Sequence, residues 1–464
     1  MKTRALVTIV LIASVLVSCA PAATQVPSTE TVIPTATLTP VPLTPTITPT
    51  LTPENLGDAK DLSKWVEGYV HAFGGKITVN DVEMDTSQLT DAIRKNSEAF
   101  IRVKEIAGIE YLFFLINDVP LAMREGKGQW EELTSRKMID LGAKPDDVFK
   151  YFGAQFSNPF NLSKSAEVDE LLGEEFNSAF LNDGYWHVVE QREGHPDFTD
   201  VVDAAKEARQ KGMFVIGGQL VDPRGEFEYT YLKNRKDISR DELASIMVEH
   251  IKMQMEALKG NVDAYVVVNE SRAANETTDE GTYADPFNSI IGEDYIETAF
   301  QTARDTDPNV VLIYNDGDNY HPAYDYTNGS NNTPRTLEVV NRLKAKGLID
   351  GVGIQMHIFA SEPPNMDKMV KTIKAYGVPV YVTELEINID NIDGSDSEKA
   401  QIRTDLYRKI LTTILENNLA VAVSHWTSVS DDSGHAGQLF DDQLNPTVNL
   451  FVERQVLFEY LLGN

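Results

Sequence analysis

Two glutamates stand near the ends of apolar runs in the second half of the chain. The run AYVVVNE ends in Asn269-Glu270, and the run VYVTELEI carries Thr383-Glu384. If these runs are parallel strands of a closed barrel, their carboxyl ends surround one mouth, where the chemistry of such barrels takes place. Two carboxyl groups that face one sugar can hydrolyse a glycosidic bond, because one protonates the leaving oxygen and the other lies ionised below the anomeric carbon. One glutamate at a strand end would simply face solvent, so it is the pair that predicts glycoside hydrolysis.

The apolar runs that carry these residues belong to a regular series. The eight runs are Tyr151–Phe156, Phe176–Leu181, Met213–Leu220, Ala264–Asn269, Val310–Asn315, Gly351–His357, Val380–Ile387 and Leu419–His425. Stretches of helical period lie between them, including Asp200–Gln210, Asp241–Leu258, Asp294–Ala303, Thr336–Lys346, Met366–Tyr376 and Glu398–Asn417. Apolar strands joined by crossover helices predict an α/β fold with a parallel sheet, and eight of them close a TIM (β/α)8 barrel. An open doubly wound sheet is the alternative, but no glycine-rich phosphate turn follows the first run.

The start of the chain reads as an export signal. Two basic residues precede the apolar run Ala5–Val17, which is too short to span a bilayer as a mature helix. The run closes on Leu16-Val17-Ser18-Cys19, which resembles the bacterial lipobox, and Cys19 is the one cysteine of the chain. We therefore predict that residues 1–19 are a lipoprotein signal peptide and that lipid on Cys19 anchors the protein, outward facing, to a bacterial membrane. An ordinary signal peptide with an incidental cysteine is the alternative.

Three further segments follow the signal. Residues 20–54 are almost wholly Thr, Pro, Val, Leu, Ala and Ser, which predicts an extended, semi-rigid linker. Residues 55–146 combine strand-like runs at Lys76–Met84 and Ile109–Asn117 with a helical stretch at Thr90–Ile106, and we expect a small α+β accessory domain there. Residues 147–464 hold the predicted barrel, which is the expected catalytic domain.

Composition restricts the partners of the protein. The formal net charge is −30, which argues against a nucleic-acid-binding surface because phosphates require basic patches. A neutral polysaccharide would feel no such repulsion. No His, Asp or Cys residues have the spacing of metal ligands, so we expect neither a metal ion nor an organic cofactor. We expect a monomer.

Five motifs follow one another in the second half of the chain, and they are IGEDYIETAF (Ile291–Phe300), LIYND (Leu312–Asp316), GVGIQMHI (Gly351–Ile358), VTELEI (Val382–Ile387) and LFDDQLNP (Leu439–Pro446). In their order and spacing they resemble the glycoside hydrolase family 10 xylanases, and the resemblance runs from about Phe149 to Leu462. The resemblance implies a retaining enzyme in which Glu270 is the general acid/base and Glu384 is the nucleophile.

The resemblance also implies which other residues form the site. Asn269 corresponds to the asparagine that holds the 2-hydroxyl of the sugar under attack. His357 resembles the histidine that orients the nucleophile, and Gln355 lies two residues before it, on the same face of the expected strand. The remaining positions are an asparagine after the second strand, an asparagine near the acid/base and a tryptophan under the reacting sugar, which are Asn182, Asn315 and Trp426.

The sequence departs from the family where the sugars on the non-reducing side bind. Tyr185 stands where the family has a lysine, and the third strand reads FVIGGQL, with Gly217 and Gly218 near the usual Trp-His pair. Two glycines would leave space and remove both a stacking face and a donor. These departures change the sugar-binding positions and leave both glutamates in place. From the resemblance we expect a retaining endo-β-1,4-glycanase with xylan as the leading polysaccharide substrate, and the departures keep other polymers open. The alternatives are a β-glycanase for a glucan or mixed-linkage polymer, and a cell-surface polysaccharide-binding barrel without turnover.

Overall fold

The computed structural model describes residues 134–462, except positions 145, 157–164, 224–229, 236, 273–284, 321–331, 391, 427, 430–437, 442–443 and 445. Nearer the N-terminus it describes residues 77–79, 82–85, 87–88, 101–106, 109–116 and 119–125. Cys19, the predicted linker and part of the predicted accessory domain lie outside the described residues.

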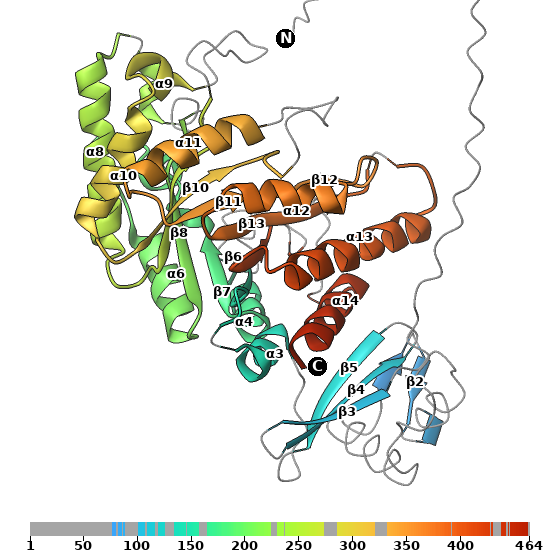
Figure 1. Ribbon diagram of the computed structural model, residues 1–464. Helices are drawn as coiled ribbons and strands as arrows, with labels where there is room; N and C mark the ends of the chain where they lie inside the picture. Colours follow the sequence, from blue (N-terminus) through green and yellow to red (C-terminus); the bar gives the residue numbers. More distant parts are fainter. Residues whose placement is uncertain are drawn as a thin grey trace, which may run out of the picture. The chain divides into compact units, whose positions relative to one another are not determined.

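Eight parallel strands close into a barrel (Figure 1). In chain order they are β6 (Tyr151–Phe156), β7 (Ser178–Leu181), β8 (Phe214–Val221), β9 (Ala264–Asn269), β10 (Val311–Asp316), β11 (Gly351–Ile354), β13 (Val380–Asn388) and β14 (Ala422–His425). Each strand pairs with the next one in this series, and β14 pairs with β6 to complete the ring. The predicted TIM barrel is therefore confirmed.

Helices follow the strands and surround them (Figure 1). They are α4 (Ser165–Glu175), α5 (Trp186–Val189), α6 (Thr199–Gln210), α8 (Arg240–Ala257), α9 (Pro286–Ile290), α10 (Tyr295–Thr306), α11 (Thr333–Ala345), α12 (Met366–Ala375), α13 (Asp396–Glu416) and α14 (Val448–Leu457). Helix α10 shows how the sequence orients such a helix. Its residues Ile296, Ala299, Phe300 and Ala303 recur at helical spacing and are all buried, so one apolar side faces the protein interior.

An apolar layer fills the barrel interior. It consists of Phe180, Ile216, Ala264, Val266, Ile313, Tyr381 and Ala422, which come from six of the eight strands. Full burial of a large apolar side chain stabilises the fold by about 1.5–3 kcal/mol. This layer thus holds the ring closed and supports the polar side chains that follow at the carboxyl ends of the strands.

The sixth predicted strand, Gly351–His357, is interrupted. Strand β11 ends at Ile354, Met356 has a left-handed φ of 60°, and β12 (His357–Phe359) then pairs with β13 alone. A non-glycine residue rarely adopts such a φ, and this turn separates Gln355 from His357. The expectation that these two side chains share one strand face is therefore wrong.

The N-terminal strands agree with the sequence only in part. Strands β1 (Ile77–Val79) and β2 (Val82–Met84) form an antiparallel hairpin inside the predicted strand-like run. Strands β3 (Ile101–Ile106), β4 (Ile109–Ile116) and β5 (Val119–Glu125) form an antiparallel sheet. The end of the predicted helix Thr90–Ile106 is thus a strand, because the segment IRVK alternates apolar and charged residues with a period of two.

Helix α3 (Ser135–Gly142) bonds to the outer helices of the barrel. The backbone N–H and the hydroxyl of Ser135 donate to Glu175 Oε1 at 2.9 and 2.6 Å. Arg454 of α14 donates from Nε to the same oxygen at 3.0 Å. All three residues are buried, so this network joins α3 and α14 through the end of α4.

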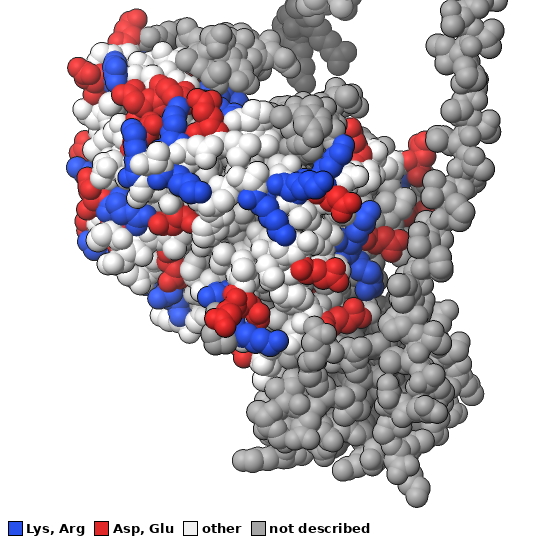
Figure 2. Space-filling model, in the orientation of Figure 1, with Lys and Arg blue, Asp and Glu red and all other residues white. Residues whose placement is uncertain are grey.

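The charges of the described surface are mixed. On the face shown in Figure 2, basic side chains lie among acidic ones. Within the described part of the chain, no helix combines the length and the apolar character that a membrane span requires.

Candidate active site

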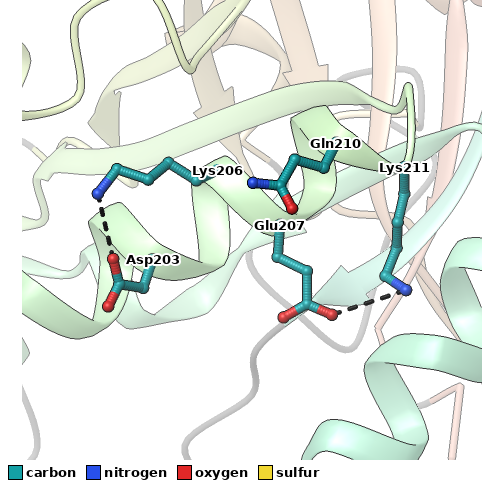
Figure 3. A pocket seen from close by; sticks show the side chains of 5 residues that line it. All are labelled: Asp203, Lys206, Glu207, Gln210 and Lys211. Atoms are coloured by element: carbon teal, nitrogen blue, oxygen red, sulfur yellow. Dashed lines mark hydrogen bonds and ion pairs between the residues drawn. The ribbon is translucent and has the colours of Figure 1, made fainter.

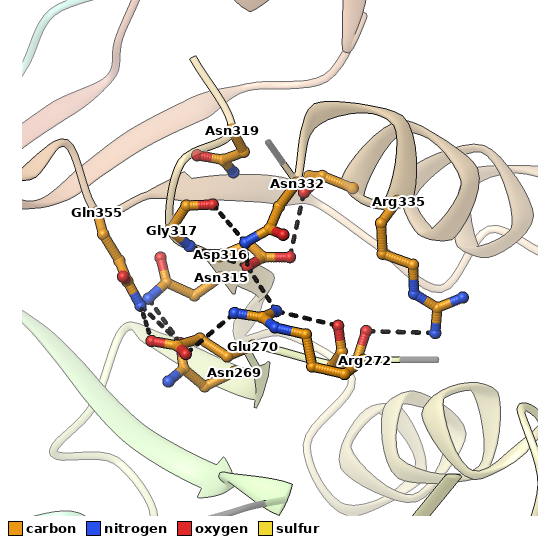
Figure 4. Close-up of polar contacts among 12 residues, drawn as sticks. Asn269, Glu270, Arg272, Asn315, Asp316, Gly317, Asn319, Asn332, Arg335 and Gln355 are labelled. Carbon is orange, nitrogen blue, oxygen red and sulfur yellow. Dashed lines mark hydrogen bonds and ion pairs between the residues drawn. The ribbon is translucent and has the colours of Figure 1, made fainter. Parts of the chain in front are cut away.

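Glu270 follows β9 directly, at the carboxyl end of the barrel. Its φ of 47° is left-handed and turns the chain out of the strand immediately after Asn269. Gln355 donates from Nε2 to Glu270 Oε1 at 2.8 Å, and Arg272 donates from Nη2 to Oε2 at 3.2 Å (Figure 4). The Glu270 side chain is still 32% exposed, so both of its oxygens have donors while the group remains open to solvent.

Glu384 lies within β13 and is almost fully buried. Asn315 donates from Nδ2 to its Oε1 at 3.0 Å, and His357 Nε2 lies 3.2 Å from its Oε2. Burial raises the pKa of Glu384, the hydrogen bond and charge of His357 lower it, and the negative charge of Glu270 raises it. The two glutamates therefore lie at the same mouth of the barrel, near enough for their charges to interact. Their surroundings differ, because Glu384 is buried and Glu270 is partly exposed.

Buried amides connect the two glutamates. The Nδ2 of Asn315 donates to Asn269 Oδ1 at 3.0 Å as well as to Glu384. The Nε2 of Gln355 donates to Asn269 Oδ1 at 3.3 Å as well as to Glu270. The residues Glu384, Asn315, Asn269, Gln355 and Glu270 thus form one hydrogen-bonded chain across the mouth, and most of it is drawn in Figure 4.

Asn315 lies beside Glu270, as expected, but its side chain bonds to Glu384 instead. It meets Glu270 only through its backbone oxygen, which accepts the Glu270 N–H at 3.0 Å. Its side chain is fully buried, and the Oδ1 accepts from Thr383 Oγ1 at 2.8 Å. Because both ends of the amide are used inside the protein, Asn315 supports Glu384 and has no surface to offer to a substrate.

His357 lies between two carboxylates. Its Nε2 contacts Glu384, and its Nδ1 lies 2.9 Å from Glu386 Oε2. Burial lowers the pKa of His357, but the hydrogen bonds to Glu384 and Glu386 outweigh it and raise the pKa to about 10. The ring is therefore a cation at neutral pH. The half-buried Trp426 packs edge-on against it, with ring centroids 5.7 Å apart.

Four charged residues of this region were not identified from the sequence, and they are Asp222, Arg272, Asp316 and Glu386. Arg272 donates from Nη1 to Asp316 Oδ1 at 3.0 Å. Burial raises the pKa of Asp316 to about 6, although Arg272 lowers it. Asp222 accepts from Asn269 Nδ2 at 3.3 Å. Asp222, Arg272 and Asp316 stand at or just after the carboxyl end of a strand, and Glu386 lies near the end of β13. This position is the signal that could have revealed them.

The turn after β7 carries Asn182 and Tyr185. The short 3-10 helix η3 (Asn182–Gly184) is fixed by Gln254, which donates from Nε2 to the Gly184 oxygen at 2.6 Å. Burial raises the pKa of Tyr185, and the charges of Glu384, Asp222 and Glu270 raise it further, so Tyr185 lies among the carboxylates. Asn182 is buried, and among the described residues its Oδ1 has no hydrogen-bond donor.

The room expected at the glycines of β8 is occupied. A Cβ atom on Gly218 would lie 2.7 Å from the Val266 oxygen, and its φ of 120° suits glycine alone. A Cβ atom on Gly217 would lie 3.0 Å from the Tyr265 ring. The expectation that these glycines leave open space is therefore wrong, because β9 packs against them.

A hollow elsewhere on the surface lies along α6 and is lined by Asp203, Lys206, Glu207, Gln210 and Lys211 (Figure 3). Lys206 pairs with Asp203 at 3.2 Å and Lys211 with Glu207 at 3.6 Å. Such solvated ion pairs contribute about 0–1 kcal/mol, and they describe an ordinary helix surface. Among the described residues, no group of three or more His, Cys, Asp or Glu side chains is arranged to hold a metal ion.

Comparisons with known proteins identify the family of the chain. Residues 141–453 match the model of glycosyl hydrolase family 10. The chain is 30% identical over 334 residues to endo-1,4-beta-xylanase A of Humicola insolens, a match that covers 68% of this chain and 82% of the relative. It is 26% identical over 322 residues to endo-1,4-beta-xylanase B of Thermotoga neapolitana, covering 66% and 87%.

Solved structures show the same fold. The crystal structure of native xylanase 10B from Thermotoga maritima aligns with a TM-score of 0.61 at 25% identity, covering 72% of this chain and 100% of that chain. Xylanase 10B from Thermotoga petrophila, solved in complex with xylobiose, aligns with a TM-score of 0.61 at 24% identity, covering 71% and 99%. The chain therefore belongs to glycosyl hydrolase family 10, and it is an endo-xylanase-like glycoside hydrolase.

Proposed function

We propose that the protein is a retaining endo-β-1,4-glycanase with xylan as its leading substrate. The observation that carries the proposal is the contrast between the two carboxyl groups. Glu384 is buried and held by two donors, as a nucleophile of fixed position requires, whereas Glu270 is solvent-accessible, as a group that exchanges protons requires. The matched relatives are named endo-1,4-beta-xylanases, which supports xylan.

In the first step, a Glu384 oxygen attacks the anomeric carbon while Glu270 gives its proton to the leaving oxygen. The bond from the anomeric carbon to the leaving oxygen breaks as the glycosyl ester forms. The cationic His357 favours the ionised form of Glu384, and Asn315 fixes its other oxygen. In the second step, Glu270 takes a proton from water, the water oxygen bonds to the anomeric carbon, and the ester to Glu384 breaks with retained configuration.

Three further side chains are assigned to the sugar. The Oδ1 of Asn182 is a buried acceptor without a donor among the described residues, and a sugar hydroxyl would satisfy it. The amide nitrogen of Asn269 is the donor assigned to the 2-hydroxyl of the reacting sugar. The half-buried ring of Trp426 offers an apolar face to the C–H groups of that sugar.

A second candidate is a β-glycanase for a glucan or a mixed-linkage polymer. It is favoured by Tyr185, which lies among the site carboxylates where the family has a lysine, and by the packed glycines of β8, which carry neither a ring nor a donor. Reducing ends released from xylan, β-glucan and mixed-linkage glucan would separate the two candidates. We expect the highest kcat/KM on xylan, and a tenfold or greater preference for a glucan would overturn that choice.

The roles of the glutamates are tested by two variants. Glu270→Ala removes the proton donor, so hydrolysis of substrates with poor leaving groups should fall by about 10²–10⁴, while activated aryl glycosides still form the glycosyl-enzyme. Azide should then restore turnover and give a β-glycosyl azide, because no carboxylate repels the anion. Glu384→Ala should lose activity on every substrate, by a factor on the order of 10⁴ or more.

Glu416→Ala, an exposed glutamate at the end of α13, is the matched control and should keep the unmodified rate. Azide rescue of Glu384→Ala to a β-product would reverse the assigned roles. A wild-type protein that binds glycans but cleaves no aryl glycoside would support a binding protein instead.

We also propose that the chain is exported and held at the outer face of a bacterial membrane by lipid on Cys19. The lipobox-like sequence that ends at Cys19 and the Thr/Pro-rich stretch 20–54 support this placement. An extended linker would hold the barrel away from the membrane, within reach of a polymer.

A further inference from the structure

We propose that Arg272 and Asp316 form a charge pair that positions Glu270 and balances its two protonation states. The proposal rests on the acid/base role proposed above for Glu270. In it, Arg272 is a positioning residue that acts on the reaction through Glu270, and Asp316 acts through Arg272.

The backbone of Arg272 is fixed on both sides of its peptide. Its N–H donates to Asp285 Oδ2 at 3.0 Å, and its carbonyl oxygen accepts from Asn288 Nδ2 at 2.8 Å. Asp285 is the N-terminal cap of α9, and Asp285 and Asn288 are both buried. The backbone of Arg272 is thereby tied to α9, so its side chain starts from a fixed position.

The guanidinium lies between the two carboxyl groups (Figure 4). Its Nη2 donates to Glu270 Oε2 at 3.2 Å, and its Nη1 donates to Asp316 Oδ1 at 3.0 Å and to the Ser271 oxygen at 3.1 Å. The Arg272 side chain is 17% exposed and Asp316 is fully buried. One largely desolvated cation is thus shared by a solvent-accessible carboxyl group and a buried one.

Asp316 is built into the protein as the permanent partner of this cation. Its oxygens also accept from the Gly317 N–H at 2.9 Å, Asn332 Nδ2 at 3.1 Å, Tyr314 Oη at 3.0 Å and Thr336 Oγ1 at 3.2 Å. These donors favour an ionised Asp316, whereas its burial opposes the charge. Glu270 accepts from Arg272 and Gln355, and its side chain is 32% exposed, so it is the carboxyl group of this pair that a substrate and water can reach.

The sharing of Arg272 matters because Glu270 must hold a proton in the first step and lose it before the second. Arg272 and Gln355 both donate to Glu270, and such donors favour the carboxylate, which is the form that acts as base. An Arg272 without Asp316 would favour that form too strongly for proton donation. The negative charge of Asp316 offsets this preference and leaves Glu270 able to act as acid.

Other charged or titratable groups also face this pair. Glu384, His357 and Tyr185 lie across the mouth. Asp222 lies beside Asn269, and Asp285 and Arg335 lie next to Arg272 or Ser271. All of them remain in the variants below, so a changed pH profile would come from the Arg272–Asp316 pair itself.

A double-mutant cycle on the full chain tests the proposal, with kcat/KM measured against pH on aryl glycosides of good and poor leaving groups. Asp316→Asn leaves Arg272 with Glu270 alone. We expect the alkaline limb of its profile to move to lower pH and poor leaving groups to lose about 10- to 100-fold more than good ones, within the range of lost general acid catalysis. Arg272→Gln should move the limb to higher pH. The double variant should return it close to the wild-type position.

Arg304→Gln is the matched control. Arg304 is 20% exposed, pairs with Asp350 and donates to the Val310 oxygen at 2.9 Å, ahead of β10 and therefore at the other end of the barrel. It should leave the pH profile unchanged. Alkaline limbs that stay at the wild-type pH in all three site variants, with losses equal for both kinds of leaving group, would reduce the pair to a structural role.

Two results separate this proposal from the proposed function. If Glu270→Ala shows neither leaving-group dependence nor azide rescue, the acid/base role fails, whatever Arg272 does. If Glu270→Ala behaves as expected but the limbs do not move in opposite directions, only the role of the charge pair fails. Should Arg272→Gln not fold, Asp316→Asn and the double variant still carry the test, since the second should reverse the shift of the first.

Discussion

At the scale of single residues, His357 couples the proposed nucleophile to the rest of the site. It lies between Glu384 and Glu386, and its pKa of about 10 keeps it charged at neutral pH. Because this value is above the unfolded value of about 6.5, the pairing stabilises the fold fully below about pH 6.5 and loses that effect as the pH rises through 10. The same charge favours the ionised Glu384 that attack requires.

Removing that charge should raise the pKa of Glu384, on which burial already acts in the same direction. We expect His357→Gln to move the acidic limb of kcat/KM to higher pH. Near pH 6, kcat/KM should fall by about 10- to 150-fold, the equivalent of a hydrogen bond to a charged group worth about 1.5–3 kcal/mol. A pH–rate profile checks this. If the acidic limb stays where it is in the wild type, His357 does not control the ionisation of Glu384.

The sequence could point to Glu270 and Glu384 as candidates because Glu270 directly follows an apolar strand and Glu384 lies within another. The ends of strands also mark the positions of Arg272 and Asp316, but they do not predict the contact between the two side chains, which joins positions 44 residues apart. An arginine three residues after a strand is typical of an exposed loop, and an aspartate at a strand end is typical of a turn. Only the folded barrel shows that the two share one buried contact.

At the scale of elements, apolar periodicity was enough to locate the eight strands, since strands buried on both faces leave short runs without polar residues. It could not reveal the turn at Met356, because GVGIQMHI has no glycine or proline at the break. That turn directs Gln355 to Glu270 and His357 to Glu384. The close packing of β8 on β9 could not be predicted either, because the sequence does not show which atoms lie beside a glycine.

The contact between β8 and β9 leads to a prediction about stability. In Gly218→Ala, the new Cβ atom would lie 2.7 Å from the Val266 oxygen, so the strands must separate. We expect unfolding free energy, measured in urea, to fall by about 2–4 kcal/mol, the sum of a strained φ and a backbone clash. Gly260→Ala is the control, since its φ is also positive at 81° but nothing lies within 4 Å. It should lose only about 1–2 kcal/mol, and equal losses would show that the clash with β9 is relieved without cost.

At the scale of the whole molecule, the barrel and the predicted linker differ in how much apolar surface they can bury. The barrel from α3 to α14 is held by a buried interior and by the Ser135, Glu175 and Arg454 network. The composition of residues 20–54 offers little apolar periodicity to bury, so we predict that this segment acts as an extended linker. The sequence predicts both kinds of segment, because composition alone separates them.

The proposed anchor is tested by Cys19→Ala in a bacterial host that processes lipoproteins. The variant lacks the one thiol that can carry the lipid, so it should leave the membrane fraction while the unmodified chain remains there. Fractionation followed by immunoblotting measures both. Glycanase activity per molecule should be equal in the two forms. Membrane association to the same degree in both would mean that something other than Cys19 holds the protein.

The most direct test of the proposed double displacement is the configuration of the first product. Proton NMR can follow a β-linked oligosaccharide that the wild-type protein cleaves and record the anomeric signal of the new reducing end before mutarotation. We expect the β-anomer to appear first and the α-anomer to follow only at the rate of mutarotation, because Glu384 and then water each invert the anomeric carbon. An α-anomer that appears first would mean a single inversion, and it would contradict Glu384 as the nucleophile.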